Sequence, residues 1–242
     1  MSPRALPLLR ALVAVLIVAI VVVAAALVRQ LVVGSGGAPR TELERAVAAA
    51  EEAVRGNPND PQARVKLAAA YLEQGSANSA IKQAQNAIRL APKDPSGYYI
   101  LGLAEGKSGD SKSAVADLRK AGTMEGQQAG FYQDAYVALA HEQEKAGDLK
   151  GAKASLDKAI DYGPENALLL YERGAFAERQ NDWYTAALDY GWALQYVPTY
   201  QVAQDGLARV KKDHPAEAKK AAADLSTDAR FNAPAVSATG TK

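Results

Sequence analysis

Side chains that could carry out chemistry are scarce in this sequence of 242 residues. It has no cysteine, which excludes disulfides, thiolate metal sites, iron–sulfur clusters and cysteine nucleophiles. Of its two histidines, His141 precedes Glu142, but Lys145 stands where a His-Glu-x-x-His zinc motif needs its second histidine. Serine-hydrolase elbows and Gly-rich nucleotide-binding loops are also missing. We therefore expect no catalytic residue, no metal site and no cofactor, and a protein that is not an enzyme.

The charges argue against a nucleic-acid partner. The 28 Lys and Arg residues nearly balance the 27 Asp and Glu residues, for a formal net charge of +1, whereas nucleic acid requires a dense basic surface. Aromatic residues make up only 7% of the chain and Ala is abundant, which favours helices. The first 40 residues carry four arginines and no acid.

An unbroken apolar run of 18 residues covers residues 11–28. As a helix it would extend about 27 Å, close to the hydrocarbon core of a bilayer at about 30 Å. We therefore predict one N-terminal transmembrane helix within an anchor region at 1–33, followed by a flexible linker at 34–40. Two alternatives stay open, namely a signal peptide cleaved near Ala24–Ala26 and a buried core helix. Arginines ahead of the run favour a cytoplasmic N-terminus and an extracytoplasmic C-terminal domain.

The remaining chain repeats itself at a period of about 34 residues. Small residues recur in two series, seven residues apart: Ala80, Ala114, Ala152 and Ala186, then Ala87, Ala121, Ala159 and Ala193. Five residues before the first series stands a turn-forming residue: Gly75, Gly109, Gly147 or Asn181. Three of the four units close with a proline: Pro92, Pro164 and Pro198.

This pattern resembles the tetratricopeptide repeat (TPR). The resemblance implies an all-α fold, a right-handed α-solenoid in which each unit is a pair of antiparallel helices, A and B. Four units are predicted, at 61–94, 95–128, 133–166 and 167–200. Gly or Asn would end helix A in a left-handed conformation, and an Asp would cap helix B in three units: Asp110, Asp148 and Asp182.

Two kinds of departure interrupt the pattern. Arg64 and Arg173 occupy positions where the family has a bulky apolar residue. Four residues are inserted near Gln127 to Tyr132, which would either lengthen a helix by one turn or widen a loop.

Flanking segments complete the predicted TPR domain at 41–212. A half repeat at 41–58 would supply a lone helix B that starts the stack, and a capping helix at 199–212 would cover its end. The C-terminal segment, 213–242, holds one Ala-rich helical stretch, and we expect it to be mostly disordered.

In the family, helix A lines a concave groove, with ligand-facing residues at the second, fifth, ninth, twelfth and thirteenth positions of each unit. The predicted groove residues are Val65, Tyr99, Leu103, Lys107, Val137, His141, Tyr171 and Arg179. Tyr99 and Tyr171 could instead pack between neighbouring helices, and His141 could be an ordinary half-exposed histidine. The positions of the Lys, Asn and Arg that grip a C-terminal carboxylate in some family members hold other residue types here, so that mode of recognition is not expected.

From these features we predict a membrane-anchored adaptor or scaffold that binds a partner peptide or protein segment in its groove. The partner would be a membrane or envelope protein, and the role would lie in cell-envelope protein assembly. No small-molecule substrate is expected. The alternative is a structural subunit of a membrane complex, which an apolar convex face would favour and the polar residues of the predicted B helices do not. Cleavage of the N-terminal helix would instead give a secreted binder.

Overall fold

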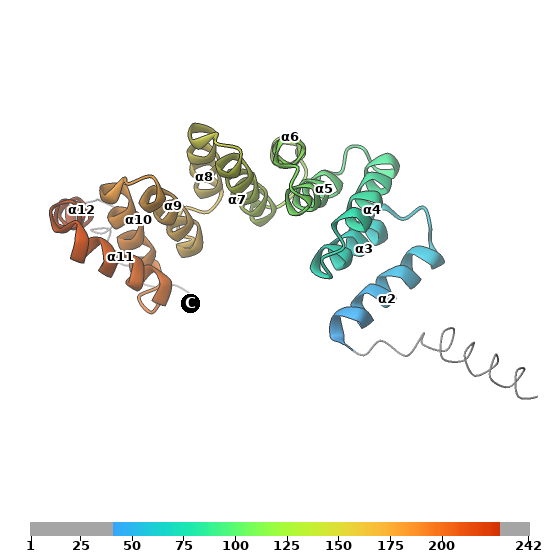
Figure 1. The fold of residues 1–242 in the computed structure, drawn as a ribbon, viewed down its shortest axis with the longest axis horizontal. Coiled ribbons are helices and arrows are strands. Elements are labelled where there is room, and N and C mark those ends of the chain that lie inside the picture. Colours follow the sequence, from blue (N-terminus) through green and yellow to red (C-terminus); the bar gives the residue numbers. More distant parts are fainter. Residues whose placement is uncertain (1–40, 228–242) are drawn as a thin grey trace, which may run out of the picture. The chain divides into compact units, whose positions relative to one another are not determined.

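The computed structural model describes residues 41–227, and within this range the chain forms eleven α-helices, α2 to α12, with no strand (Figure 1). The predicted membrane anchor at 11–28, the linker at 34–40 and the last residues of the C-terminal segment lie outside the described residues. Between residues 41 and 227 no helix combines the length and apolar character needed to cross a membrane. The described residues divide between two compact units, and the division follows Ala48 within α2 (Glu42–Gly56).

The start of α2 is fixed by a capping box. The Glu44 amide donates to Thr41 Oγ1 at 3.0 Å, and the Thr41 amide donates to Glu44 Oε2 at 3.3 Å. These reciprocal bonds satisfy amides that have no partner within the helix. The sequence predicts a helix in this half repeat, and α2 lies within its range.

Eight helices form four successive helix–turn–helix pairs within the second unit. The pairs are α3 (Pro61–Glu73) with α4 (Ala77–Leu90), α5 (Pro95–Ser108) with α6 (Ser111–Thr123), α7 (Ala129–Lys145) with α8 (Leu149–Tyr162), and α9 (Ala167–Arg179) with α10 (Trp183–Tyr196). The first helix of each pair is helix A and the second is helix B. The all-α repeat fold expected from the sequence is therefore present.

Every A–B turn contains one residue in the left-handed region. Gly75, Gly109 and Gly147 have φ between +80° and +94°, and Asn181 has φ of +60°. In three pairs an Asp follows and its Oδ1 accepts an amide of the first turn of helix B, from Ser113, Gly151 or Thr185. Each such cap stabilises a helix by about 1 kcal/mol. These turns confirm the prediction made from the Gly/Asn series.

The inserted residues lengthen a helix. Helix α7 has 17 residues, against 13 in α3 and α9, and it starts at Ala129, four residues before the predicted start of the third unit. The Tyr132 hydroxyl donates to Met124 O at 2.8 Å and accepts the Gln127 amide at 3.3 Å. The loop before α7 is thereby tied to its extra turn.

The backbones of consecutive A helices approach one another closely, whereas those of consecutive B helices do not, either among α4, α6 and α8 or between α8 and α10. The stack is thus more tightly packed on its A-helix side. One junction is weaker than the others, because α8 packs against α9 less extensively than α4 against α5 or α6 against α7. The weak junction lies between the third and fourth pairs.

The largest side chain that is fully buried, Tyr190 in α10, lies under two glycines. A Cβ atom on Gly174 would meet its ring at 3.0 Å, and one on Gly206 would meet it at 2.6 Å. A side chain at Gly206 would therefore displace the tyrosine, so this glycine is needed for the close approach of α11 (Gln201–Asp213) to α10.

Helix α12 (Pro215–Thr227) extends the fold beyond the predicted cap. Its Ala218 and Ala221 are buried, it packs on α10 and α11, and its Asp224 Oδ2 accepts the Tyr184 hydroxyl at 2.7 Å. The Ala-rich helical stretch expected within 213–242 is therefore present at 215–227, and the structure adds that it packs on the end of the stack. Its packing was not predicted, because its buried surface is mostly alanine and an Ala-rich sequence resembles a solvated helix.

Candidate functional site

A cavity of about 230 Å³ opens between the A helices α5, α7 and α9. We call it the A-helix pocket. Its lining residues are Tyr99, Asp134, Val137, Ala138, His141, Asn166, Leu168, Leu169 and Glu172. Three consecutive units contribute to it, so it exists only in the stacked array.

The apolar part of the A-helix pocket comes from aliphatic residues and one aromatic ring. Tyr99 is half-buried and its ring packs edge-on to Phe131 of α7, with centroids 5.4 Å apart. Burial, and secondarily the charge of Asp134, raise the pKa of the Tyr99 phenol. Leu168 is 51% exposed although it lines the pocket, so apolar surface remains open to solvent here.

The polar part is dominated by acceptors. His141 Nε2 lies 3.1 Å from Glu172 Oε2, which links α7 to α9. Both polar groups of the Asn166 side chain have hydrogen-bond partners. Its Oδ1 accepts the Leu168 amide and so caps α9, and its Nδ2 donates to Gln133 Oε1. The Asp134 side chain makes no hydrogen bond to any residue between 41 and 227. Two carboxylates therefore line the pocket, and neither Lys nor Arg does.

Three of the predicted groove residues, Tyr99, Val137 and His141, come together in the A-helix pocket. Two others, Val65 and Leu103, pack against the helix-interface cores instead. Lys107 is exposed near the end of α5.

The last two predicted residues, Tyr171 and Arg179, also lie outside the pocket lining. Tyr171 packs against Tyr190 and Tyr200, with ring centroids 5.8 and 5.6 Å apart. Arg179 donates Nε and Nη2 to the two carboxylate oxygens of Glu144, both at 2.8 Å. Its hydrogen bonds hold the Glu144 pKa below the ordinary value.

The sequence prediction missed several lining residues. Asp134 and Leu168 stand at the second position of their units, a position that faces ligands in the resembled family, so the repeat register could have identified them. Glu172 follows Tyr171 at the sixth position, and no spacing rule indicates that it would meet His141 of the preceding unit.

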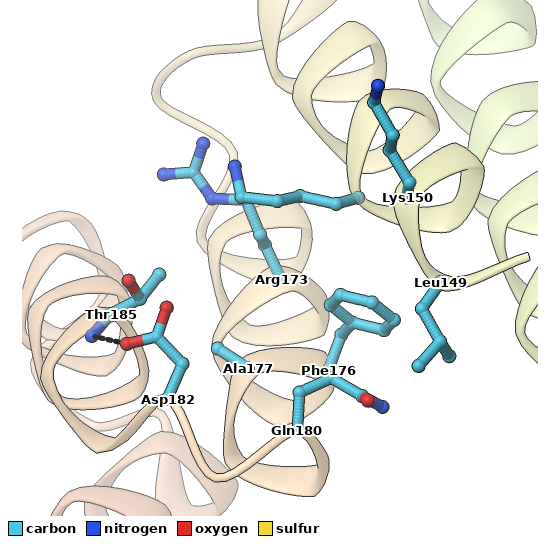
Figure 2. Close-up of a pocket in the computed structure, with 9 residues that line it drawn as sticks. Leu149, Lys150, Arg173, Phe176, Ala177, Gln180, Asp182 and Thr185 are labelled. Carbon is cyan, nitrogen blue, oxygen red and sulfur yellow. Dashed lines mark hydrogen bonds between the residues drawn. The ribbon is translucent and has the colours of Figure 1, made fainter.

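A second cavity, of about 280 Å³, lies between α8, α9 and α10. Figure 2 shows Phe176 between Arg173 and Leu149 on its floor. Most of the surface that lines it is apolar, although six of the nine lining residues are polar or charged. Lys153 and Arg173 are both paired with Asp157, at 3.1 and 2.8 Å. Asp182 is occupied in capping α10. Among the described residues only Lys150 of its lining cations has no counter-ion.

Within the range 41–227, no group of three His, Asp or Glu side chains is placed to hold a metal ion. The A-helix pocket therefore offers side-chain contacts to a ligand: aliphatic side chains, an aromatic ring and two carboxylates. A stack of helix pairs with such a pocket is the architecture of a helical-repeat interaction protein.

The particular family follows from comparison with known proteins. Tetratricopeptide repeat models match residues 41–103 and 137–195, together about half of the chain. The chain belongs to the tetratricopeptide repeat family, whose members bind peptide or protein partners, and it is a protein-interaction adaptor or scaffold. Curated protein sequences give no match to it.

Solved structures of TPR proteins share the fold. YrrB, described as a TPR protein with an unusual peptide-binding site, is 20% identical, with a TM-score of 0.53 over 68% of this chain and 82% of that one. A thermophilic TPR protein of Thermus thermophilus is 21% identical, with a TM-score of 0.57 over 69% and 90%. MamA from Desulfovibrio magneticus is 17% identical, with a TM-score of 0.54 over 71% and 94%. At these identities the similarity concerns the fold.

Proposed function

We propose that this protein is a membrane-anchored TPR adaptor that captures a segment of a partner protein in the A-helix pocket. The observation that carries the proposal is the pocket itself, in which three units bring exposed apolar side chains, an aromatic ring and polar groups together. An exposed apolar and aromatic centre with polar groups around it is the usual composition of a peptide-binding surface.

The membrane part of the proposal rests on the sequence. The apolar run at 11–28 is long enough to cross a bilayer, and the Gly- and Ser-containing linker at 34–40 would let the repeat domain reorient above the membrane. Anchoring raises the local concentration of the domain near other membrane proteins. The position of the arginines supports an extracytoplasmic domain. A repeat domain on that side of the membrane would act in envelope protein assembly.

A structural subunit of a membrane complex is the second candidate. The supporting observation is the cavity beside α8, where Leu149 is 42% exposed next to the buried Phe176. A permanent partner that covered this B-helix side would remove exposed apolar surface from water.

Site-specific photo-crosslinking of the full chain in native membranes tests the two candidates. The crosslinking amino acid replaces Leu168 in the A-helix pocket or Leu149 beside the second cavity, because both leucines are substantially exposed. Lys82, exposed on helix B of the first pair, is the control position. One dominant protein adduct at Leu168, with none at Leu149 or Lys82, supports the adaptor. The same protein at all three positions indicates an enclosed subunit, and no adduct at Leu168 contradicts capture in the pocket.

The anchor is tested separately by alkaline extraction of membranes. The full chain should stay in the membrane pellet, and a variant that lacks residues 11–28 should be released. Release of the intact full chain would contradict the anchor.

A further inference from the structure

We propose that the A-helix pocket selects a lysine or arginine side chain of the partner segment. This inference rests on the proposed function and deepens it, because it names the chemistry that the pocket recognises. Its basis is the lining of the pocket, which contains the carboxylates of Asp134 and Glu172 and no Lys or Arg.

Both carboxylates have acceptor capacity left for a ligand. Asp134 hydrogen-bonds no residue in the described range, and its charge acts on the phenol of Tyr99 across the pocket. His141 contacts only Oε2 of Glu172 and leaves Oε1 without a hydrogen bond to a described residue. The Glu172 side chain is 23% exposed, so solvent screens it less than a surface charge, whereas Asp134 is exposed to solvent.

Neighbouring cations do not cancel this charge. Helix α9 carries two arginines besides Glu172. Arg179 is held by both oxygens of Glu144, and Arg173 is held by Asp189 and Asp157. If His141 is protonated, its positive charge offsets one of the two carboxylates. If His141 is neutral, it offsets neither carboxylate. The pocket therefore carries negative charge whether His141 is protonated or not. Its field therefore attracts a cation and repels an acidic side chain.

The apolar lining suits the rest of a basic side chain. Lys and Arg carry a long aliphatic stem, which can lie along Val137, Ala138, Leu168 and Leu169 while the charged end reaches the carboxylates. The ring of Tyr99 offers a cation a further favourable contact. A purely apolar side chain would cover the two carboxylates without giving them a partner, which is unfavourable.

The test selects peptides directly. A phage-displayed library of random nonapeptides is panned against the full chain in detergent micelles. Two variants are panned in parallel, Asp134→Asn/Glu172→Gln and the control Asp161→Asn/Glu165→Gln. The control removes the same charge from exposed residues outside the pocket, around the α8–α9 loop. Thermal unfolding must show that all three proteins are folded.

We expect the wild type and the control to enrich peptides with Lys or Arg at one fixed position. The pocket variant should lose that preference. Replacing the selected basic residue of one such peptide by norleucine should weaken its binding roughly fivefold, as the loss of one partly exposed ion pair predicts. If the selected peptide suppresses crosslinking from the crosslinking amino acid that replaces Leu168, the peptide occupies the pocket.

Two other results have distinct meanings. In the first, peptides compete with crosslinking at Leu168 but have no fixed Lys or Arg, or the pocket variant still selects a Lys or Arg. This result would overturn the selectivity for a basic side chain and leave the adaptor function standing. If no peptide is enriched, or none competes at Leu168, both the selectivity and capture in the pocket are wrong.

Discussion

Arg173 donates Nε and Nη2 to the two oxygens of Asp189, at 2.8 and 2.7 Å, and so joins α9 to α10 through a carboxylate that is fully buried. Its Nη1 donates to Asp157 of α8 at 2.8 Å. The hydrogen bonds to Asp189, more than the opposing burial, raise the pKa of Arg173 above its ordinary value. An arginine at an apolar position of the repeat is thus explained by two acids on neighbouring helices.

Replacing Arg173 by the leucine that the repeat pattern calls for should destabilise the fold. Arg173→Leu leaves Asp189 buried without a counter-ion, and such a change costs about 3–5 kcal/mol. The double variant Arg173→Leu/Asp189→Ala removes the isolated charge and should regain most of the loss. Urea unfolding followed by circular dichroism measures both. Equal stability of Arg173→Leu and wild type would show that the arginine pair is not needed.

The stability of the protein should depend on pH through Glu105. Its Oε2 is buried and has no hydrogen-bond partner among the described residues. The pKa of Glu105 is raised from 4.5 to about 7. Burial is the largest cause, and the negative charge of Asp117 and a hydrogen bond with that residue add to it. The folded protein thus holds a proton that the unfolded chain releases near pH 4.5. The resulting stabilisation is complete below that pH and is lost as the pH rises to about 7.

Glu105→Gln should remove this dependence. Because Glu105 is only partly buried, solvent screening limits the change to about 1 kcal/mol between pH 4.5 and 7.5. Thermal unfolding at a series of pH values measures it, with the exposed Glu125→Gln as control. A Glu105→Gln profile with the same slope as the control would contradict a shared proton between Glu105 and Asp117.

Two glycine-to-alanine changes should have opposite signs. Gly206→Ala places a Cβ atom 2.6 Å from the Tyr190 ring and should destabilise the protein by about 1–3 kcal/mol. Gly130→Ala meets nothing within 4 Å in the first turn of α7 and should stabilise it by about 0.5 kcal/mol. Urea midpoints give both values. Similar effects of the two changes would mean that α11 can move away from α10 at little cost.

The sequence predicts the repeat well because its signals are local. Left-handed turns need Gly or Asn, and helix caps need Asp, so Gly147 and Asp148 mark one turn without any knowledge of the tertiary fold. The packing of helix α12 could not be predicted, because its buried face consists of alanines, as at Ala218, and depends on the shape of α10.

The candidate site was predicted only in part. Repeat register places Tyr99, Val137 and His141 on one side of the stack, and the structure brings these three together. The repeat register in the sequence cannot tell which residues at equivalent positions face a neighbouring unit. Tyr171 occupies the same register as Tyr99, yet it lies outside the pocket lining, with its ring against Tyr190 and against Tyr200 at the start of α11. The contact of His141 with Glu172 depends on how two units are stacked, which spacing alone does not define.

The weak junction between α8 and α9 has a consequence for cooperativity. In a linear array the coupling between neighbours decides whether the units unfold together. Here part of that coupling comes from Arg173 with Asp157, His141 with Glu172 and Arg179 with Glu144, which join the third pair to the fourth. Salt weakens exposed charge pairs but not apolar packing. The free energy of a half-folded species, folded on one side of this junction only, therefore falls relative to that of the folded protein as ionic strength rises.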